Sequence, residues 1–301
     1  MVLTPTAEPT APPASTAPPA RGTSENFDPT VILPGVGADS TSVWILNVNE
    51  DKVDLLSATG FVGSIHAGRQ PSAIVFEGEN VWIASAADAI VSILVPNENP
   101  RGPFRVGLQP RALEFDGQNI WVASAGEQTI SKLSTDGEEL ATTFIGGFPT
   151  ALQFDGEHIW VADIINDRLL KFNLDAERVG AVNTGRSPRA LAFDGTNIWV
   201  SNVLDGTVSK ISVDGNVVAT YPVGGRPVDI LYAEYEGGRY IWVANMDDDT
   251  VMKLSLDGQR VAVVPVDESP VSLALFGSDL IVVSSVIQSL TRVPLATRDG
   301  G

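Results

Sequence analysis

The sequence predicts an all-β fold, a seven-bladed β-propeller of four-stranded antiparallel blades. One sign is a repeat of about 39 residues, and another is the Asp-Gly pairs that separate short runs of β-forming residues. All six tryptophans fall in one slot of this repeat, and Ile281 takes the same slot in the seventh unit: Trp44, Trp82, Trp121, Trp160, Trp199 and Trp242. Repeats of this length with four strands each are typical of propellers.

Each repeat contains four strand signals, which we name a to d. In the copy PRALEFDGQNIWVASAGEQTISKLSTDGEELATTFIGG (110–147), strand a is the A-L-E-F run after a proline and strand b is I-W-V-A. Strand c is T-I-S-K-L, and strand d is the last β-rich run, which ends in glycine. Asp-Gly between such runs is a strong hairpin signal, because glycine accepts a positive φ. Each repeat is therefore expected to form one antiparallel sheet.

The repeat also sets the domain boundaries. Residues 1–28 begin with a tract rich in Pro, Ala and Thr, which predicts a disordered linker. The blades are expected near 29–69, 70–108, 109–147, 148–186, 187–225, 226–268 and 269–301. We assign residues 29–39 to strand a of blade one, the alternative being strand d of the last blade. Blade seven has no strand d of its own, so either residues 22–28 supply it or that edge stays unpaired.

Composition excludes several classes of partner. The formal net charge of −18 disfavours nucleic acid, because binding to a phosphate backbone needs clustered Lys and Arg. The chain has no cysteine and no apolar run long enough to span a bilayer. We therefore expect no nucleic-acid partner and no membrane insertion by this chain. The Pro-rich tract resembles a tether, which predicts an extracytoplasmic or secreted domain, with a cytoplasmic one as the alternative.

Propeller geometry places the b–c and d–a loops on one face, which we call the top face. Five arginines in or next to the d–a loops are our candidates for binding an anion through bidentate hydrogen bonds: Arg69, Arg111, Arg186, Arg189 and Arg226. The alternative is that these arginines pair with acids of the b–c loops. Those acids are Asp88, Glu127, Asp163, Asp167, Asp205 and Asp247 to Asp249.

Asp163 is the best single acid for a site. It stands three residues after Trp160, at the top end of strand b, in a slot that holds only Asn or Ser in the other blades. A small polar residue there also suits capping of the following loop. His158 and Asp155 lie at the other end of the strand and are expected to be turn residues. The run Asp247 to Asp249 either attracts a divalent cation or is ordinary loop acidity.

Two further residue types recur once per blade. The tryptophans are expected to pack between neighbouring blades rather than to form a ligand cage. A basic residue of strand c is expected to form a solvated ring on the outer wall. Its copies are Lys132, Lys171, Lys210, Lys253 and Arg292.

The proline-led strand a, the FDG turn, the I-W-V-A strand and the T-x-x-K-[IL] strand resemble the seven-bladed propellers of the streptogramin B (virginiamycin B) lyase-like group. They are also similar to YVTN and NHL repeat proteins. The resemblance covers residues 29 to about 295. It implies a Mg²⁺-dependent lyase with a His directly after the strand a proline and a Glu just past strand b. In this chain the first slot holds no His, but Ser72, Arg111, Thr150, Arg189, Val228 and Val271.

We therefore expect a non-enzymatic binding or sensor propeller without a cofactor, whose top face holds a protein, a peptide or a small anionic ligand. The alternative is a metal-assisted lyase or lactonase-type enzyme of the same group. In that case Asp163 and the arginines would surround a divalent cation in the central channel.

Overall fold

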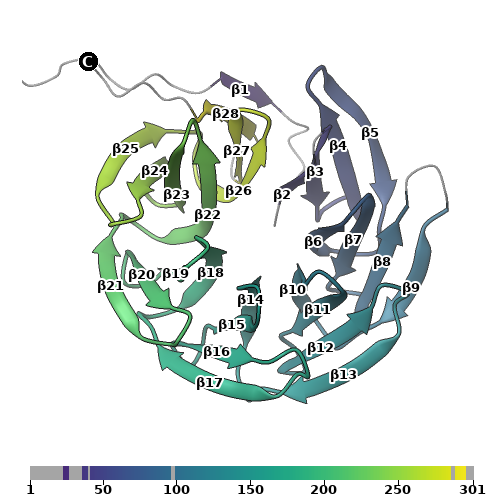
Figure 1. Ribbon diagram of the computed structural model, residues 1–301. Helices are drawn as coiled ribbons and strands as arrows, with labels where there is room; N and C mark the ends of the chain where they lie inside the picture. The colour runs from purple at the N-terminus through teal and green to yellow at the C-terminus, as the bar shows by residue number, and fades with distance from the viewer. Residues whose placement is uncertain (1–22, 27–35, 40, 96–98, 286–288, 296–301) are drawn as a thin grey trace, which may run out of the picture.

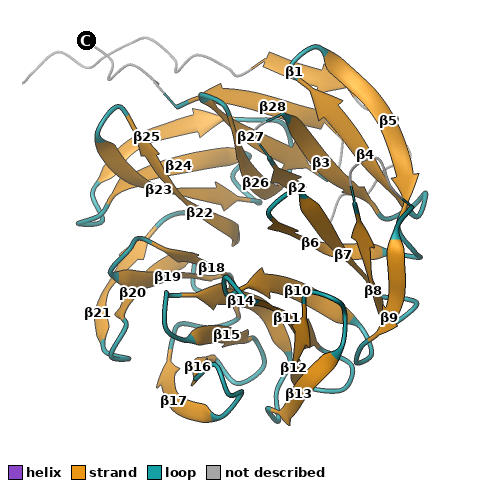
Figure 2. Ribbon diagram, turned by 45° about the vertical axis from the view of Figure 1, so that its right-hand side comes forward, coloured by secondary structure: helices purple, strands orange, loops and turns teal. Residues whose placement is uncertain are grey.

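The computed structural model describes residues 23–26, 36–39, 41–95, 99–285 and 289–295. They form seven four-stranded antiparallel sheets arranged as a ring, which confirms the predicted propeller (Figure 1). Strands and loops account for all of the described residues (Figure 2). No described helix could cross a membrane.

The innermost strands, strand a of each blade, surround the centre of the ring. They are β2 (Val36–Ala38), β6 (Pro71–Glu77), β10 (Pro110–Phe115), β14 (Pro149–Phe154), β18 (Pro188–Phe193), β22 (Pro227–Tyr235) and β26 (Pro270–Phe276). The b strands follow outward. They are β3 (Ser42–Asn47), β7 (Asn80–Ser85), β11 (Asn119–Ser124), β15 (Ile159–Asp163), β19 (Asn197–Asn202), β23 (Gly238–Asn245) and β27 (Asp279–Ser284).

The c strands lie next to the b strands. They are β4 (Lys52–Ser57), β8 (Ile90–Leu94), β12 (Thr129–Ser134), β16 (Arg168–Phe172), β20 (Thr207–Ser212), β24 (Thr250–Ser255) and β28 (Ser289–Pro294). The outermost d strands complete the blades. They are β5 (Gly60–His66), β9 (Arg101–Arg105), β13 (Glu139–Phe144), β17 (Arg178–Asn183), β21 (Val217–Pro222), β25 (Arg260–Pro265) and, for blade seven, β1 (Thr23–Asn26).

The ring closes through β1, which joins the two ends of the chain. This strand pairs antiparallel with β28, with Thr23 opposite Arg292 and Asn26 opposite Ser289. The range expected to be linker thus contains one strand of the propeller, and residues 23–26, within the stretch 22–28, supply the missing edge. Blade one begins with the short strand β2, within the stretch assigned to its strand a. Pro29, which set the expected start of that blade, lies outside the described residues.

The core consists of apolar clusters between neighbouring blades, one at each of the seven junctions. Each tryptophan packs toward the following blade, as predicted; Trp121, for example, joins a cluster with Leu152 and Ile159 of blade four. Five of the six indoles are at most 1% exposed, and Trp44 is 9% exposed. Burying a side chain of this size stabilises the fold by several kcal/mol, so the repeated Trp contributes strongly to the packing between blades.

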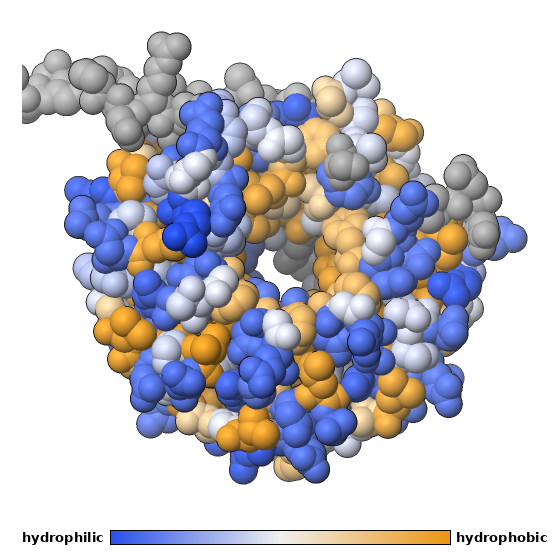
Figure 3. All heavy atoms as spheres, viewed as in Figure 1, coloured by the Kyte–Doolittle hydropathy of each residue, from blue (hydrophilic) through white to orange (hydrophobic). Residues whose placement is uncertain are grey.

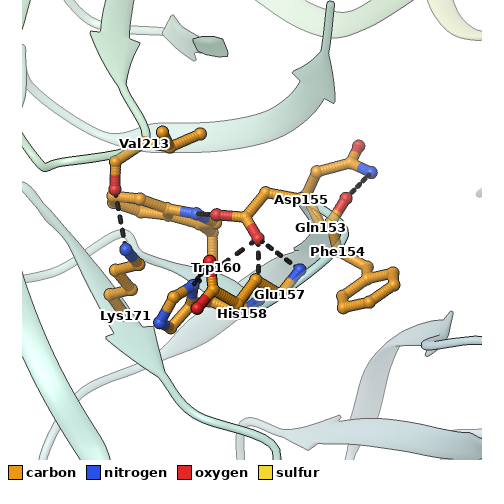
Figure 4. A network of polar contacts seen from close by, with 8 residues as sticks. All are labelled: Gln153, Phe154, Asp155, Glu157, His158, Trp160, Lys171 and Val213. Carbon is orange, nitrogen blue, oxygen red and sulfur yellow. Dashed lines mark hydrogen bonds and ion pairs between the residues drawn. The ribbon is translucent and has the colours of Figure 1, made fainter. Parts of the chain in front are cut away.

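In four blades, one aspartate fixes the a–b turn. In the fourth blade, Asp155 Oδ1 accepts hydrogen bonds from the backbone N–H groups of Glu157 and His158, at 2.9 and 2.7 Å (Figure 4). Its Oδ2 accepts the indole N–H of Trp160 at 2.7 Å. The same indole bond joins Trp44 to Asp39, Trp121 to Asp116 and Trp199 to Asp194. The Asp therefore anchors both the turn and the tryptophan, which confirms the turn role of Asp155.

The prediction that the strand c lysines form a solvated ring is wrong. Lys171 lies directly opposite Trp160 in the sheet, and its Nζ sits 5.3 Å from the indole centroid. The same Nζ donates a hydrogen bond of 2.7 Å to the carbonyl of Val213 in the next blade (Figure 4). Lys132, Lys210 and Lys253 make the equivalent contacts. Stacking on an aromatic face holds the stem inward, so the charge bridges two blades instead of facing solvent.

Candidate functional site: the top face and channel mouth

An opening lies at the centre of the ring (Figure 3). Each inner strand from β6 onward begins with a proline at its top end, so the residues that follow these prolines occupy equivalent positions around the opening. Ser72 and Thr150, which follow two of these prolines, donate hydrogen bonds to the proline carbonyl of the next blade, at 2.6 and 3.2 Å. Arg111 and Arg189 occupy the same slot in blades three and five. The strand register thus brings these two arginines to the channel mouth.

The loops of the top face are tied together by a repeated backbone hydrogen bond. The residue before the inner-strand proline accepts a hydrogen bond from the b–c loop of its own blade, as Gln109 does from Ala125 at 3.0 Å. Five other blades make this contact, through the carbonyls of Gln70, Phe148, Ser187, Arg226 and Ser269. The side chains around the opening therefore stand on a fixed frame.

Arg69 and Arg186 do not face the channel mouth freely. Arg69 Nε lies 2.7 Å from Asp88 Oδ1, and Arg186 Nε lies 2.6 Å from Asp205 Oδ1. The backbone N–H of each arginine donates to the second oxygen of the same carboxylate, at 2.8 and 2.7 Å. These contacts are the pairing with b–c loop acids that we gave as the alternative.

Arg226 is also paired, because its Nη1 lies 3.3 Å from Asp247 Oδ1. The neighbouring acids of that loop are engaged as well. Asp248 accepts a hydrogen bond from the Gly225 N–H at 2.7 Å, and Asp249 accepts one from the Ser269 N–H at 2.8 Å. The three aspartates thus act as loop anchors.

Arg111 and Arg189 differ from the other three candidates. Neither makes a hydrogen bond or ion pair with any residue that the structure describes, and both are exposed. Partial burial of Arg189 within the ring lowers its pKa; Asp229 raises it, and the positive charges of Arg226 and Arg111 lower it again. Arg226 and Arg111 therefore each lie within electrostatic range of Arg189. Of the five candidate arginines, Arg111 and Arg189 are thus the two without a hydrogen-bond or ion-pair partner among the described residues.

Asp163 is completely buried at the top of β15. Its Oδ1 accepts the Phe148 N–H at 3.0 Å, and its Oδ2 accepts hydrogen bonds from Asn166 Nδ2 at 2.7 Å and Arg168 Nε at 2.9 Å. A Cβ added at Gly147 would collide with this carboxylate. These contacts favour the capping role, in which Asp163 holds the d–a and b–c loops of blade four together.

Two carboxylates of the inner strands, Glu114 and Asp229, are not among the site residues predicted from the sequence. Glu114 of β10 accepts the Phe154 N–H of the next blade at 3.2 Å. Asp229 of β22 accepts the Leu273 N–H of the next blade at 2.8 Å. Burial raises the pKa of Glu114 to about 8 and that of Asp229 to about 6, because removal from water disfavours the charged form.

A signal for both was present in the repeat. The slot of Glu114 holds Val, Gln, Ala or Leu in the other blades that share the proline, and the slot of Asp229 holds Ala or Ser. An acid in a position that is uncharged in every other blade marks a departure from the packing role.

The described residues contain no cluster of three or more His, Asp or Glu side chains that could hold a metal ion. The two inner-strand carboxylates with raised pKa values, Glu114 of β10 and Asp229 of β22, already accept hydrogen bonds from backbone N–H groups. The residues that the structure describes therefore do not fit the Mg²⁺ site implied by the lyase resemblance.

No protein-family model and no curated protein matches the sequence. Solved structures do match the fold. A streptogramin B lyase aligns with a TM-score of 0.78 at 13% identity, over 90% of this chain and 96% of the lyase. The chain shares the lyase fold. A catalytically inactive virginiamycin B lyase from Staphylococcus aureus, solved with quinupristin, gives a TM-score of 0.79 at 13% identity, over 90% of this chain and 98% of that lyase.

The similarity to the lyases confirms the predicted resemblance at the level of fold. It extends to other propellers. A BBS1N chain in complex with ARL6DN gives a TM-score of 0.75 at 15% identity, over 93% of this chain and 99% of that chain. Because one fold supports different activities, the streptogramin B lyase fold does not carry the lyase activity with it.

Proposed function

We propose that this propeller is a non-enzymatic binding domain whose channel mouth holds an anionic group of a protein, a peptide or a small molecule. The observation that carries the proposal is the pair Arg111 and Arg189. Both stand in the same slot of the inner strands, and neither has a partner among the described residues. In a chain with a net charge of −18, two unpaired cations at one opening are a local reversal of charge.

The electrostatics of the mouth support an anion there. Partial burial lowers the pKa of Arg189; Asp229 opposes this effect, and the positive charges of Arg226 and Arg111 add to it, so the free site brings like charges near one another. A carboxylate or phosphate would relieve this repulsion and accept bidentate hydrogen bonds from a guanidinium. Such bonds gain strength where the walls of the channel exclude part of the water.

Isothermal titration with citrate and with a blocked tetra-aspartate peptide tests this proposal. We expect the double variant Arg111→Gln/Arg189→Gln to bind at least tenfold more weakly than the unmodified protein. The matched control is Arg69→Gln/Arg186→Gln, which removes the same charge from the same face but from arginines already held by aspartates. The proposal fails if neither probe binds, or if both double variants lose affinity equally.

A second candidate is a ring-opening enzyme of the lyase or lactonase sort. It is supported by Asp229, an inner-strand carboxyl whose pKa burial raises to about 6, within the range suited to a general base. Incubation with quinupristin, followed by chromatography of the cyclic compound, tests this candidate. The enzyme is favoured if the unmodified protein consumes the cyclic compound and the Asp229→Asn variant does not. If the unmodified protein leaves the compound unchanged, the result counts against the enzyme.

A further inference from the structure

A pocket of about 120 Å³ lies on the top face, over blades one to three. Its lining comes from the b–c loops, the d–a loops and the first residues of two inner strands. The lining residues are Val48, Gln70, Pro71, Ser72, Ala86, Gln109 and Arg111. It shares Arg111 with the channel mouth but lies on the opposite side of that residue from blade five, which carries Arg189.

Arg111 is the one charged residue in this lining. Gln70 and Gln109 occupy the same position of successive d–a loops, are exposed, and have side-chain amides without a partner among the described residues. Their backbones are fixed: Gln70 N–H donates to Asp51 Oδ1 at 2.9 Å, and the carbonyls of both glutamines accept b–c loop N–H groups. The pocket therefore offers a guanidinium and two amides on a rigid frame.

The remaining walls are apolar or already satisfied. The side chains of Val48, Pro71 and Ala86 are hydrocarbon. The Ser72 hydroxyl donates a hydrogen bond of 2.6 Å to the Pro110 carbonyl, so it has no free donor for a ligand. Asp88, the acid of the adjoining b–c loop, is held by Arg69. An apolar cup with one cationic wall selects a ligand that is itself half apolar and half anionic.

We propose that this pocket binds a carboxylate carried on a short aliphatic stem. A volume of about 120 Å³ equals that of about four water molecules, enough for about five non-hydrogen atoms. That is the size of propionate, and also of the glutamate side chain beyond Cα. The carboxylate accepts hydrogen bonds from Arg111 and the two amides, and the methylenes rest on Val48, Pro71 and Ala86.

This inference rests on the proposed function, because both use Arg111. It adds the class of ligand and places the ligand in the pocket over blades one to three, away from the channel axis. Ligand-detected saturation-transfer NMR with propionate is the direct test. We expect propionate to bind with a dissociation constant of about 1 to 10 mM, the range of a fragment of this size. Propionamide, which has the same shape without the charge, should bind at least tenfold more weakly.

Three variants locate the ligand. Arg111→Gln removes the charge, Ala86→Leu fills the pocket, and Gln109→Gly removes one amide at a position whose φ of 53° suits glycine. Each should weaken propionate binding, by at least tenfold for the first two. Gln109→Gly adds no volume, so the test stands even where Ala86→Leu fails to fold. Arg186→Gln is the charge-matched control and should change the affinity less than twofold.

The source of the carboxylate is resolved by a blocked tripeptide with glutamate between two glycines, compared with its glutamine counterpart. Tighter binding of the glutamate tripeptide than of propionate assigns the pocket to a peptide side chain, and the reverse assigns it to a free short-chain acid. The pocket proposal is overturned if neither probe binds. It is also overturned if Arg189→Gln abolishes binding while Ala86→Leu does not, a pattern that would leave the channel-mouth proposal standing.

Discussion

Replacing Glu114 by Gln should stabilise the propeller at neutral and alkaline pH. Glu114 lies on β10 and accepts the Phe154 N–H of the neighbouring inner strand through Oε1. Glutamine keeps that acceptor oxygen and the shape of the side chain. The fold already accommodates glutamine in this slot, because Gln153 occupies the equivalent position of blade four and bonds the Phe154 carbonyl at 3.1 Å.

The magnitude follows from the pKa of the carboxyl. Burial raises it from 4.5 to about 8, and since one pKa unit corresponds to about 1.4 kcal/mol, full ionisation destabilises the fold by up to about 5 kcal/mol. Below pH 4.5 the group is protonated in the folded and unfolded states, and stability does not depend on it. Between pH 4.5 and about 8 the unfolded chain loses the proton first, so stability falls as pH rises. Above about pH 8 the carboxyl is ionised in both states, and stability no longer falls with pH on its account.

Glu114 is only half-buried, so solvent screens part of this charge, and we expect Glu114→Gln to gain about 2 to 5 kcal/mol at pH 9 and almost nothing at pH 4. For a domain of this size that corresponds to roughly 4 to 10 °C in melting temperature. Calorimetry of both proteins across this pH range measures the difference. Glu139→Gln, an exposed change on β13, is the control and should give a flat difference. A Glu114→Gln gain that is absent at pH 9, or equal at both pH values, would refute the reasoning.

Three other substitutions test the repeated contacts. Asp194→Ala removes the acceptor of the Trp199 indole and of two turn N–H groups, and urea unfolding should show a loss of about 2 to 3 kcal/mol, against almost none for Asp214→Ala in a c–d turn. Lys210→Met keeps the stem but removes the charge over Trp199 and the hydrogen bond to the next blade, so the same assay should show a loss of about 1 to 2 kcal/mol. Asp163→Ala should lower the free energy of unfolding by about 3 kcal/mol, because it leaves Arg168 unpaired. The affinity of the folded variant for citrate should stay within twofold of the unmodified protein. A large loss of affinity in the folded variant would place Asp163 in the binding site.

The repeat made the fold predictable from sequence because its signals are local. An Asp-Gly turn constrains two residues, and a Trp at a fixed spacing constrains one packing contact, yet seven copies of such weak signals point to one architecture. The closure was harder to predict, since β1 pairs with β28 across almost the whole chain. A pairing at that separation leaves no periodic mark in the sequence, so it stayed one of two alternatives.

The outcome at the site was different because sequence position does not determine side-chain partners. Arg69 and Arg111 are both top-face arginines in the sequence, but only the structure shows that Asp88 holds the first and that the second has no partner among the described residues. The prediction that the strand c lysines face solvent is wrong for the same reason. A lysine on an outer strand is normally solvated, and the register that sets Lys171 opposite Trp160 is needed to see that its charge turns inward.

The candidate site emerges where the repeat fails. Positions that recur in most blades, such as the turn Asp, the strand b Trp and the residue before each inner-strand proline, make contacts within or between blades. A residue that keeps the blades together gains nothing from a ligand, because its polar atoms are already bonded. Arg111 and Arg189 replace the hydroxyl of Ser72 or Thr150, which bonds the next blade. They give up that inter-blade contact without making another, so their contribution must be sought in what enters the opening.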